Sequence, residues 1–128
     1  MRRLDPDRGS ATTEAVLLTP VLLFLVMLVI QFGLWYHAEH IAQAAAQEGV
    51  RSARVEGSTA DAGRARAADF LAASGPTIVQ DPVVTANRDA ETATVSVRGR
   101  AVTVVPGFSL PVKAIATSPV ERFRQDPG

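Results

Sequence analysis

The residues best suited to metal chemistry are His37 and His40, which lie three positions apart and flank Glu39. On a helix this spacing places both imidazoles on one face, where they could contribute two ligands to a metal ion. Two histidines are an incomplete ligand set, and the HExxH pattern is absent. The sequence also has no cysteine, which excludes thiolate ligands, disulfides and cysteine nucleophiles. We therefore predict no metal ion and no cofactor, and interpret the two histidines as polar residues at an interface.

The sequence contains none of the common catalytic or phosphate-binding motifs, such as G-x-S-x-G, the P-loop or G-x-G-x-x-G. Basic and acidic residues balance at 13 each, so the formal net charge of zero offers no general attraction for nucleic acid. We predict that the protein is not an enzyme and does not bind nucleic acid.

The boundary between the charged N-terminal residues and a long apolar run says more about function than the histidines do. Gly9 and Ser10 are followed by Glu14, and an uncharged, mainly apolar run extends from Ala15 to Tyr36 directly after it. A run of this length can cross the roughly 30 Å of a bilayer's hydrocarbon core as one helix. The sequence therefore predicts a transmembrane helix and the lipid bilayer as a partner.

The arginines predict how this helix is oriented. Arg2, Arg3 and Arg8 precede the apolar run, whereas residues 37–50 contain no lysine or arginine. By the positive-inside rule, the N-terminus lies in the cytoplasm and the C-terminal part outside the cytoplasmic membrane, with a single pass. Trp35 and Tyr36 match the aromatic belt expected at the outer boundary.

A cleaved secretory signal is the main alternative to a retained anchor. Ala42-Gln43-Ala44 has the A-x-A pattern of a signal peptidase site, and release after Ala44 would yield a secreted protein. The apolar segment of a signal peptide usually spans only about 7–15 residues, which is shorter than this run. We therefore favour the retained anchor.

The composition divides the chain into four segments. We predict a charged leader over 1–9, a transmembrane helix over 10–36, an extracytoplasmic stalk helix over 37–56, and a small head with a frayed C-terminal tail over 57–128. The Ala-, Gln- and Glu-rich stalk favours one helix from about Ser10 to Arg54. Ser58 and Asp61 form a helix-start signal for a second helix of about residues 59–73, with Phe70 and Leu71 as its core contacts.

The remainder of the head has the pattern of short strands. Residues 78–79 and 83–85 are β-prone, 87–91 read as a turn, and 92–98 alternate so that Ala93, Val95 and Val97 share one face. Gly99 suggests a bulge before a further strand over 101–105, and 112–117 form a closing strand. The predicted fold class is α+β and membrane-anchored: a long helix, a second short helix and an antiparallel meander of three or four strands.

Three stretches of the sequence resemble a known family. Gly9, Ser10 and Glu14 reproduce the prepilin pattern of a glycine ending the leader and a glutamate at mature position five. The stretches 14–20 (EAVLLTP) and 46–54 (AQEGVRSAR) are similar to the TadE-like proteins, which are pseudopilins of tight-adherence (Flp-type) pilus systems. The resemblance is strong from about Gly9 to Arg54 and weak over the head.

This resemblance implies cleavage between Gly9 and Ser10 by a prepilin peptidase, and a role as a structural subunit of pilus biogenesis, secretion or adhesion. The implied partners are the prepilin peptidase, major and minor pilins, and the inner-membrane assembly platform. Many type IV pilins have phenylalanine where this chain has Ser10, which puts N-methylation of the new terminus in doubt.

Glu14 and Pro20 also have predicted roles in the transmembrane helix. We expect Glu14 to pair with the Ser10 amine of its own or a neighbouring chain, although an acidic residue is also favoured in a helix's first turn by the dipole. Pro20 lacks an amide hydrogen and predicts a local kink. The alternative function is a single-pass anchored binding module that is not cleaved at Gly9 and recognises an extracytoplasmic ligand through its head.

Overall fold

The computed structural model describes the backbone of residues 6–122 and the side chains from Gly9 onward. Arg2, Arg3 and Asp5 of the predicted leader lie outside the described residues, as do residues 123–128 of the predicted tail. The elements, in order, are α1 (Pro6–Ala53), α2 (Ala60–Ser74), β1 (Val79–Arg88), β2 (Thr92–Ala101) and β3 (Pro111–Pro119). A long helix, a short helix and one antiparallel sheet confirm the predicted fold class.

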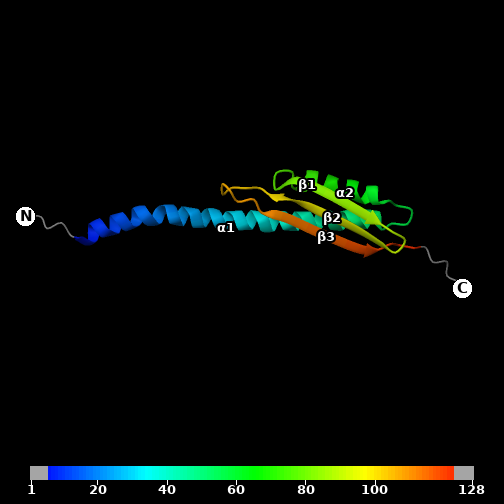
Figure 1. Ribbon diagram of the computed structural model, residues 1–128, viewed down its shortest axis with the longest axis horizontal. Coiled ribbons are helices and arrows are strands. Elements are labelled where there is room, and N and C mark those ends of the chain that lie inside the picture. Colours follow the sequence, from blue (N-terminus) through cyan, green and yellow to red (C-terminus); the bar gives the residue numbers. More distant parts are fainter. Residues whose placement is uncertain (1–5, 123–128) are drawn as a thin grey trace, which may run out of the picture.

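Helix α1 is a rod of 48 residues with two very different halves. At 1.5 Å per residue it is about 70 Å long. Figure 1 shows that its N-terminal half stands free, whereas α2 and the sheet gather along its C-terminal half. Between residues 9 and 30 every side chain except Leu28 is exposed, although most of them are large and apolar. The helix is long and apolar enough to cross a membrane.

The C-terminal half of α1 packs against α2 and the sheet. Many of its buried hydrophobic residues are alanines, whose small side chains allow the sheet and α2 to approach the helix closely. The buried hydrophobic residues of this half are Ala38, Ile41, Ala42, Ala45, Ala46, Val50 and Ala53. Cleavage after Ala44, as in the secretory-signal alternative, would remove Ala38, Ile41 and Ala42 from this core and expose the apolar surface that they cover.

Helix α2 begins one residue later than its sequence signal indicated. The side-chain oxygen of Thr59 caps the helix by accepting a hydrogen bond from the Ala62 backbone N–H at 3.1 Å. The prediction that Ser58 starts the helix was wrong by one residue, because the hydroxyl that caps the first turn belongs to Thr59. Of the two predicted core contacts, Leu71 is buried and Phe70 packs half-buried at the edge of the core.

The sheet has the order β1-β2-β3 and is antiparallel throughout. Ala93, Val95 and Val97 of the central strand are fully buried, as their alternation predicted. The register shifts on β1 between Gln80 and Val83, so that two residues of β1 lie opposite Gly99 of β2. The predicted irregularity is therefore present, but the one extra residue belongs to the partner strand β1. A Cβ on Gly99 would lie 2.9 Å from the Gln80 carbonyl oxygen, which explains the glycine.

The strand predicted over residues 101–105 does not form. Strand β2 ends at Ala101, and the next strand begins at Pro111. The segment between them, residues 102–110, is called the base loop here. It lies at the end of the sheet that faces the free half of α1 (Figure 1). Backbone groups that a fourth strand would need are instead bonded to α1, as described below.

The turn between β1 and β2 lies at the opposite end of the head. Its Asp89 carboxylate accepts hydrogen bonds from the backbone N–H groups of Thr92, at 2.7 Å, and Glu91, at 2.8 Å. These bonds stabilise the charged form and lower the pKa of Asp89 below its usual value. The turn predicted over 87–91 is thus present but shorter, over 89–91, because Asn87 and Arg88 still pair with β2 as the end of β1.

Candidate functional site

The predicted cleavage site lies in the first turns of α1. Pro6 is the first helical residue, where its fixed φ suits a helix and its missing N–H is not needed. The Gly9 carbonyl accepts a hydrogen bond from the Thr13 hydroxyl at 2.9 Å, so the Gly9–Ser10 peptide is helical in this structure. A glycine weakens a helix by about 1 kcal/mol relative to alanine. This turn therefore opens more easily than the helix that follows it.

The structure brings Gly9, Ser10 and Glu14 onto adjacent turns. Together with Thr13 and Leu17 they line a shallow hollow along the helix face. Ser10 and Glu14 are four residues apart, which is the spacing at which a helix brings side chains of opposite charge together. An amine created at Ser10 would thus lie one turn before the Glu14 carboxylate.

Pro20 lies inside a helix that continues through it. Proline cannot donate a backbone hydrogen bond to the preceding turn. Next to it, the Thr19 hydroxyl bonds to the Ala15 carbonyl at 2.6 Å. A kink at Pro20 remains a prediction.

The two histidines do not form a metal site with other side chains. Among the residues that the structure describes, no group of three or more histidines, aspartates or glutamates could hold a metal ion. His40 instead packs edge-on against Tyr36, with ring centroids 4.5 Å apart and an interplanar angle of 69°. Both histidines are exposed.

A feature that sequence reasoning missed is a row of four polar side chains that joins α1 to the head. These side chains, called the α1 ladder here, are Gln31, Trp35, Glu39 and Gln43. Trp35 donates from Nε1 to the Pro111 carbonyl at 2.9 Å. Glu39 accepts from the Lys113 N–H at 3.3 Å, and Gln43 donates to the Ile115 carbonyl at 3.5 Å. Three members therefore bond to alternate residues of β3.

The repeat distances of helix and strand explain the ladder. Four residues of helix advance about 6 Å, and two residues of antiparallel strand advance about 6.8 Å. A helix that runs along an edge strand can therefore bond to every second residue with every fourth of its own. Because β3 is an edge strand, its outward N–H and C=O groups would otherwise be open to another strand. The ladder covers this edge, and the spacing of four was the sequence signal.

Gln31 begins the ladder and is the most buried of its members, with 0% of its surface exposed. Its amide nitrogen donates to the Val102 carbonyl at 3.0 Å. Its amide oxygen accepts from the N–H groups of Val104, at 2.8 Å, and Val105, at 3.2 Å. In the sequence Gln31 only interrupts the apolar run, but in the fold it holds the base loop against α1.

Replacing Gln31 by leucine should loosen the head from the helix. The substitution leaves one buried and two part-buried N–H and C=O groups of the base loop without partners, and a fully buried group of this kind costs about 1–3 kcal/mol. We expect Gln31→Leu to lower the free energy of unfolding by at least about 2 kcal/mol. Emission of Trp35, the single tryptophan, during urea unfolding in detergent micelles measures this directly. The control is Gln47→Leu on the exposed face of the same helix, and equal behaviour of the two variants would contradict the role of Gln31.

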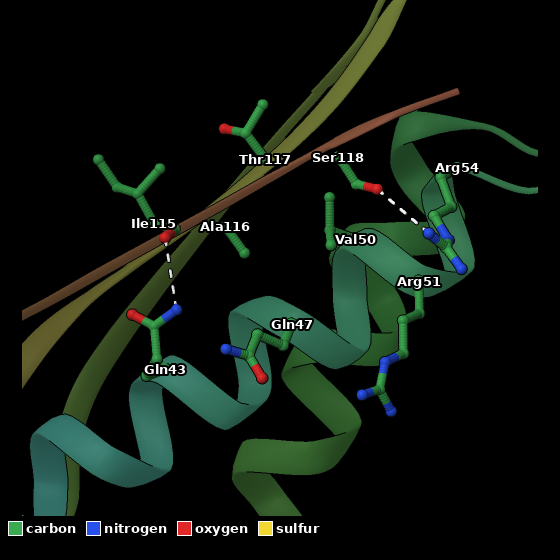
Figure 2. A pocket seen from close by; sticks show the side chains of 9 residues that line it. All are labelled: Gln43, Gln47, Val50, Arg51, Arg54, Ile115, Ala116, Thr117 and Ser118. Atoms are coloured by element: carbon green, nitrogen blue, oxygen red, sulfur yellow. Dashed lines mark hydrogen bonds between the residues drawn. The ribbon is translucent and has the colours of Figure 1, made fainter. Parts of the chain in front are cut away.

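A groove runs between α1 and β3 beyond the ladder. It encloses about 570 Å³ and is lined by polar side chains that include Gln47, Arg51, Arg54 and Thr117. Figure 2 shows Gln43 bonded to Ile115 and Arg54 bonded to Ser118 across it. The groove has donors and acceptors for a polar ligand but no arrangement of nucleophile and base.

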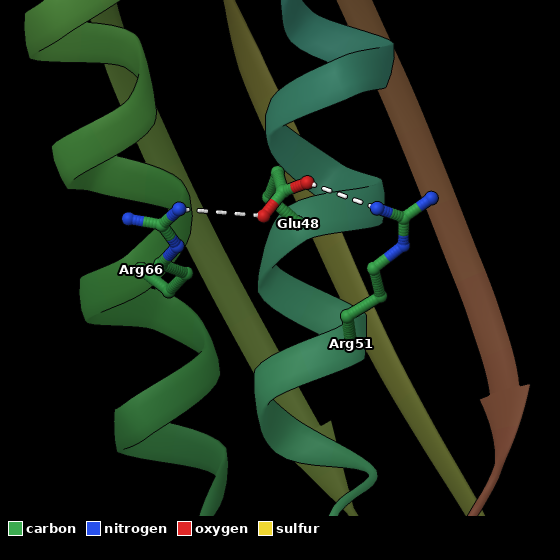
Figure 3. A network of polar contacts seen from close by, with 3 residues as sticks. All are labelled: Glu48, Arg51 and Arg66. Atoms are coloured by element: carbon green, nitrogen blue, oxygen red, sulfur yellow. Dashed lines mark hydrogen bonds and ion pairs between the residues drawn. The ribbon is translucent and has the colours of Figure 1, made fainter.

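A second polar contact joins α1 to α2. Glu48 pairs with Arg51 at 3.1 Å and with Arg66 of α2 at 3.4 Å, as Figure 3 shows. The two arginine side chains are more than half exposed, although Glu48 is only 29% exposed, so the pairs contribute little to stability. The close packing of the two helices depends instead on Gly49 and Gly63, because a Cβ on Gly49 would lie 2.8 Å from the Gly63 carbonyl oxygen.

Fold and site together define a small α+β head carried on one helix that could span a membrane. Residues 9–51 match the model of a family described as TadE-like protein. The match agrees with the resemblance to TadE-like proteins that the sequence predicted for this segment. It begins at Gly9 and includes the free half of α1, the whole α1 ladder and Gly49. No curated protein and no solved structure gave a match.

Proposed function

We propose that the protein is a TadE-like minor pseudopilin, a non-enzymatic structural component of tight-adherence (Flp-type) pilus biogenesis or secretion. The observation that carries the proposal is the division of α1, whose free apolar half begins at Gly9 and continues without a break into the core of the head. A helix of this form can hold the head at a membrane and can also pack lengthwise against other subunits. The family match over the same residues supports this role.

The proposal includes cleavage between Gly9 and Ser10 by a prepilin peptidase on the cytoplasmic side. The positive-inside rule places Arg2, Arg3 and Arg8 on that side, with the head outside the cytoplasm. Cleavage at this point would leave the apolar run attached to the head. Cleavage by a secretory signal peptidase would separate the two.

Removal of the leader changes the electrostatics of this end of the helix. The leader carries five ionisable side chains: Arg2, Arg3, Asp5, Asp7 and Arg8. Moving an arginine or aspartate to the bilayer centre costs about 2.5–3.5 kcal/mol on insertion scales. The intact leader therefore pins the N-terminus at the cytoplasmic surface. After cleavage the charges left near this end are the Ser10 amine and the Glu14 carboxylate, which can neutralise each other within one chain or between neighbours.

Assembly partners follow from this role. The prepilin peptidase would act first, and the inner-membrane assembly platform with major and minor pilins would receive the processed subunit. The free apolar side chains of α1, including Val29 at 73% exposed, would contact lipid in the membrane and other helices in an assembly.

The test is the N-terminal sequence of the mature protein, expressed with and without its cognate prepilin peptidase. We expect a chain that begins at Ser10 only when the peptidase is present. A chain that still begins at Met1 in the presence of an active peptidase would favour the uncleaved binding module. A chain that begins at Ala45 would indicate secretory cleavage and overturn the proposal.

A further inference from the structure

The base loop has a composition unlike the rest of the head. From Ala101 to Val112 the sequence has no charged residue, and Arg100 and Lys113 flank this stretch. The loop itself contains Val102, Val104, Val105, Pro106, Phe108 and Leu110. An apolar segment between two basic residues is typical of protein surfaces that contact a membrane, with the apolar residues in the lipid interface and the basic residues at headgroup level.

The loop has a defined shape. The Phe108 N–H donates to the Val105 carbonyl at 3.1 Å, with Pro106 and Gly107 at the two central positions of the turn. Gly107 has a φ of 83°, which suits a type II turn. The Thr103 hydroxyl also bonds to the Phe108 carbonyl at 2.9 Å. The turn leaves Val104 39% exposed, whereas Val105 is buried.

Gln31 sets the position of the loop along α1. Its three hydrogen bonds attach the loop at a level where the helix is still apolar on its other faces. Ile30 and Phe32, the neighbours of Gln31 in sequence, are both about half exposed. Apolar exposed residues thus lie on both sides of the attachment point. Lipid that covers Phe32 would also reach the base loop.

The length of the helix agrees with this position. From Ser10 to Gln31 the helix advances about 32 Å at 1.5 Å per residue, close to the roughly 30 Å of the hydrocarbon core. The sheet end that carries the base loop points toward the free half of α1, and the β1–β2 turn lies at the far end of the head (Figure 1).

We infer that the base loop rests in the lipid interface on the head side of the membrane, with Val104 in contact with lipid and Lys113 at headgroup level. The loop then shields the Gln31 amide from hydrocarbon and sets the height of the head above the bilayer. This inference rests on the membrane anchoring in the proposed function, and it does not depend on cleavage at Gly9.

The absence of cysteine allows one labelling site at a time in the full chain. We would attach an environment-sensitive fluorophore to Val104→Cys, to Leu22→Cys in the middle of the apolar run, and to Ala90→Cys in the β1–β2 turn. Each variant is reconstituted in vesicles of phosphatidylethanolamine and phosphatidylglycerol. Quenching by nitroxide-labelled lipid and by aqueous iodide is then measured.

We expect lipid quenching at positions 22 and 104 but not at 90, with iodide quenching at 104 less than half of that at 90. Quenching by lipid at 22, with equal iodide access at 104 and 90, would overturn the inference and leave the anchor standing. Absence of lipid quenching at 22 would contradict the anchor itself, and the inference with it. Shielding at 104 that disappears when the protein is diluted in excess lipid would show that a neighbouring chain covers the loop, which also overturns the inference.

A charge variant gives an independent readout. With the label at Ser109→Cys, Val104→Asp should move the loop toward water, since a carboxylate at this depth is unfavourable. We expect iodide quenching at 109 to at least double, while Ala90→Asp leaves it unchanged. Because Val104 is partly exposed, the substitution preserves the core, and unchanged Trp35 emission in detergent would confirm this. Iodide access at 109 that stays the same in Val104→Asp would overturn the inference.

Discussion

Gly9→Ala should make the full-length, 128-residue chain accumulate in the membrane when the prepilin peptidase is present. A peptidase that cleaves after Gly9 must approach this backbone closely and open the helical turn around it. Alanine adds a methyl group at the scissile bond and strengthens the helix by about 1 kcal/mol. We expect cleavage to slow by at least about tenfold, which corresponds to about 1.4 kcal/mol in the transition state. Immunoblotting of membranes at a series of times separates the full-length and processed chains.

The matched control is Gly33→Ala, in the same helix. A Cβ at either Gly9 or Gly33 meets no atom within 4 Å, so neither substitution disturbs packing within the chain. Gly33→Ala should be processed at the normal rate. Normal processing of Gly9→Ala would place the cut elsewhere and remove the basis of the proposed function.

Gly49→Ala should destabilise the head, even though alanine is the better helix former. The added Cβ would lie 2.8 Å from the Gly63 carbonyl oxygen and 3.0 Å from side-chain atoms of Ala67 and Val95. The nearest of these is backbone, so α1 and α2 must separate, and overpacking of this kind costs about 1–3 kcal/mol. Over nearly all of this range the loss exceeds the gain in helix propensity of about 1 kcal/mol. Urea unfolding followed by Trp35 emission should show a lower midpoint.

Gly33→Ala again serves as the control, because it brings the same gain in helix propensity without a contact. Its unfolding midpoint should stay the same or rise. Gly63→Ala should behave like Gly49→Ala, since its Cβ would lie 2.7 Å from the Ala53 Cβ. If Gly49→Ala and Gly33→Ala shifted the midpoint equally, close approach of the two helices would not be what stabilises the head.

Local patterns predicted most of the secondary structure. The uncharged run and the alanine-rich stalk predicted one continuous α1, and the alternation around Val95 predicted the central strand. Such patterns report on a residue and its neighbours along the chain. They failed at residues 101–105, where β-prone valines form a loop because the Gln31 amide binds the backbone N–H groups of Val104 and Val105. A contact across more than 70 positions leaves no local pattern.

The candidate site also has one part that local sequence patterns predicted and one part that they did not. Gly9, Ser10 and Glu14 are neighbours along one helix, so their spacing alone predicted their proximity. The α1 ladder is different, because the meaning of Gln31, Trp35, Glu39 and Gln43 depends on which strand lies beside them. Their spacing of four was visible in the sequence, but the partner was not.

What the sequence alone determined is therefore the helix that could span a membrane, the spacing of Gly9, Ser10 and Glu14 at its start and the class of the head, because these depend on composition and short-range order. Only the tertiary structure decided that the head is joined to α1 by a polar ladder, and that the base loop is attached beside the apolar run. The physical reason is that an edge strand and a buried amide acquire their hydrogen-bond partners only when distant segments pack together.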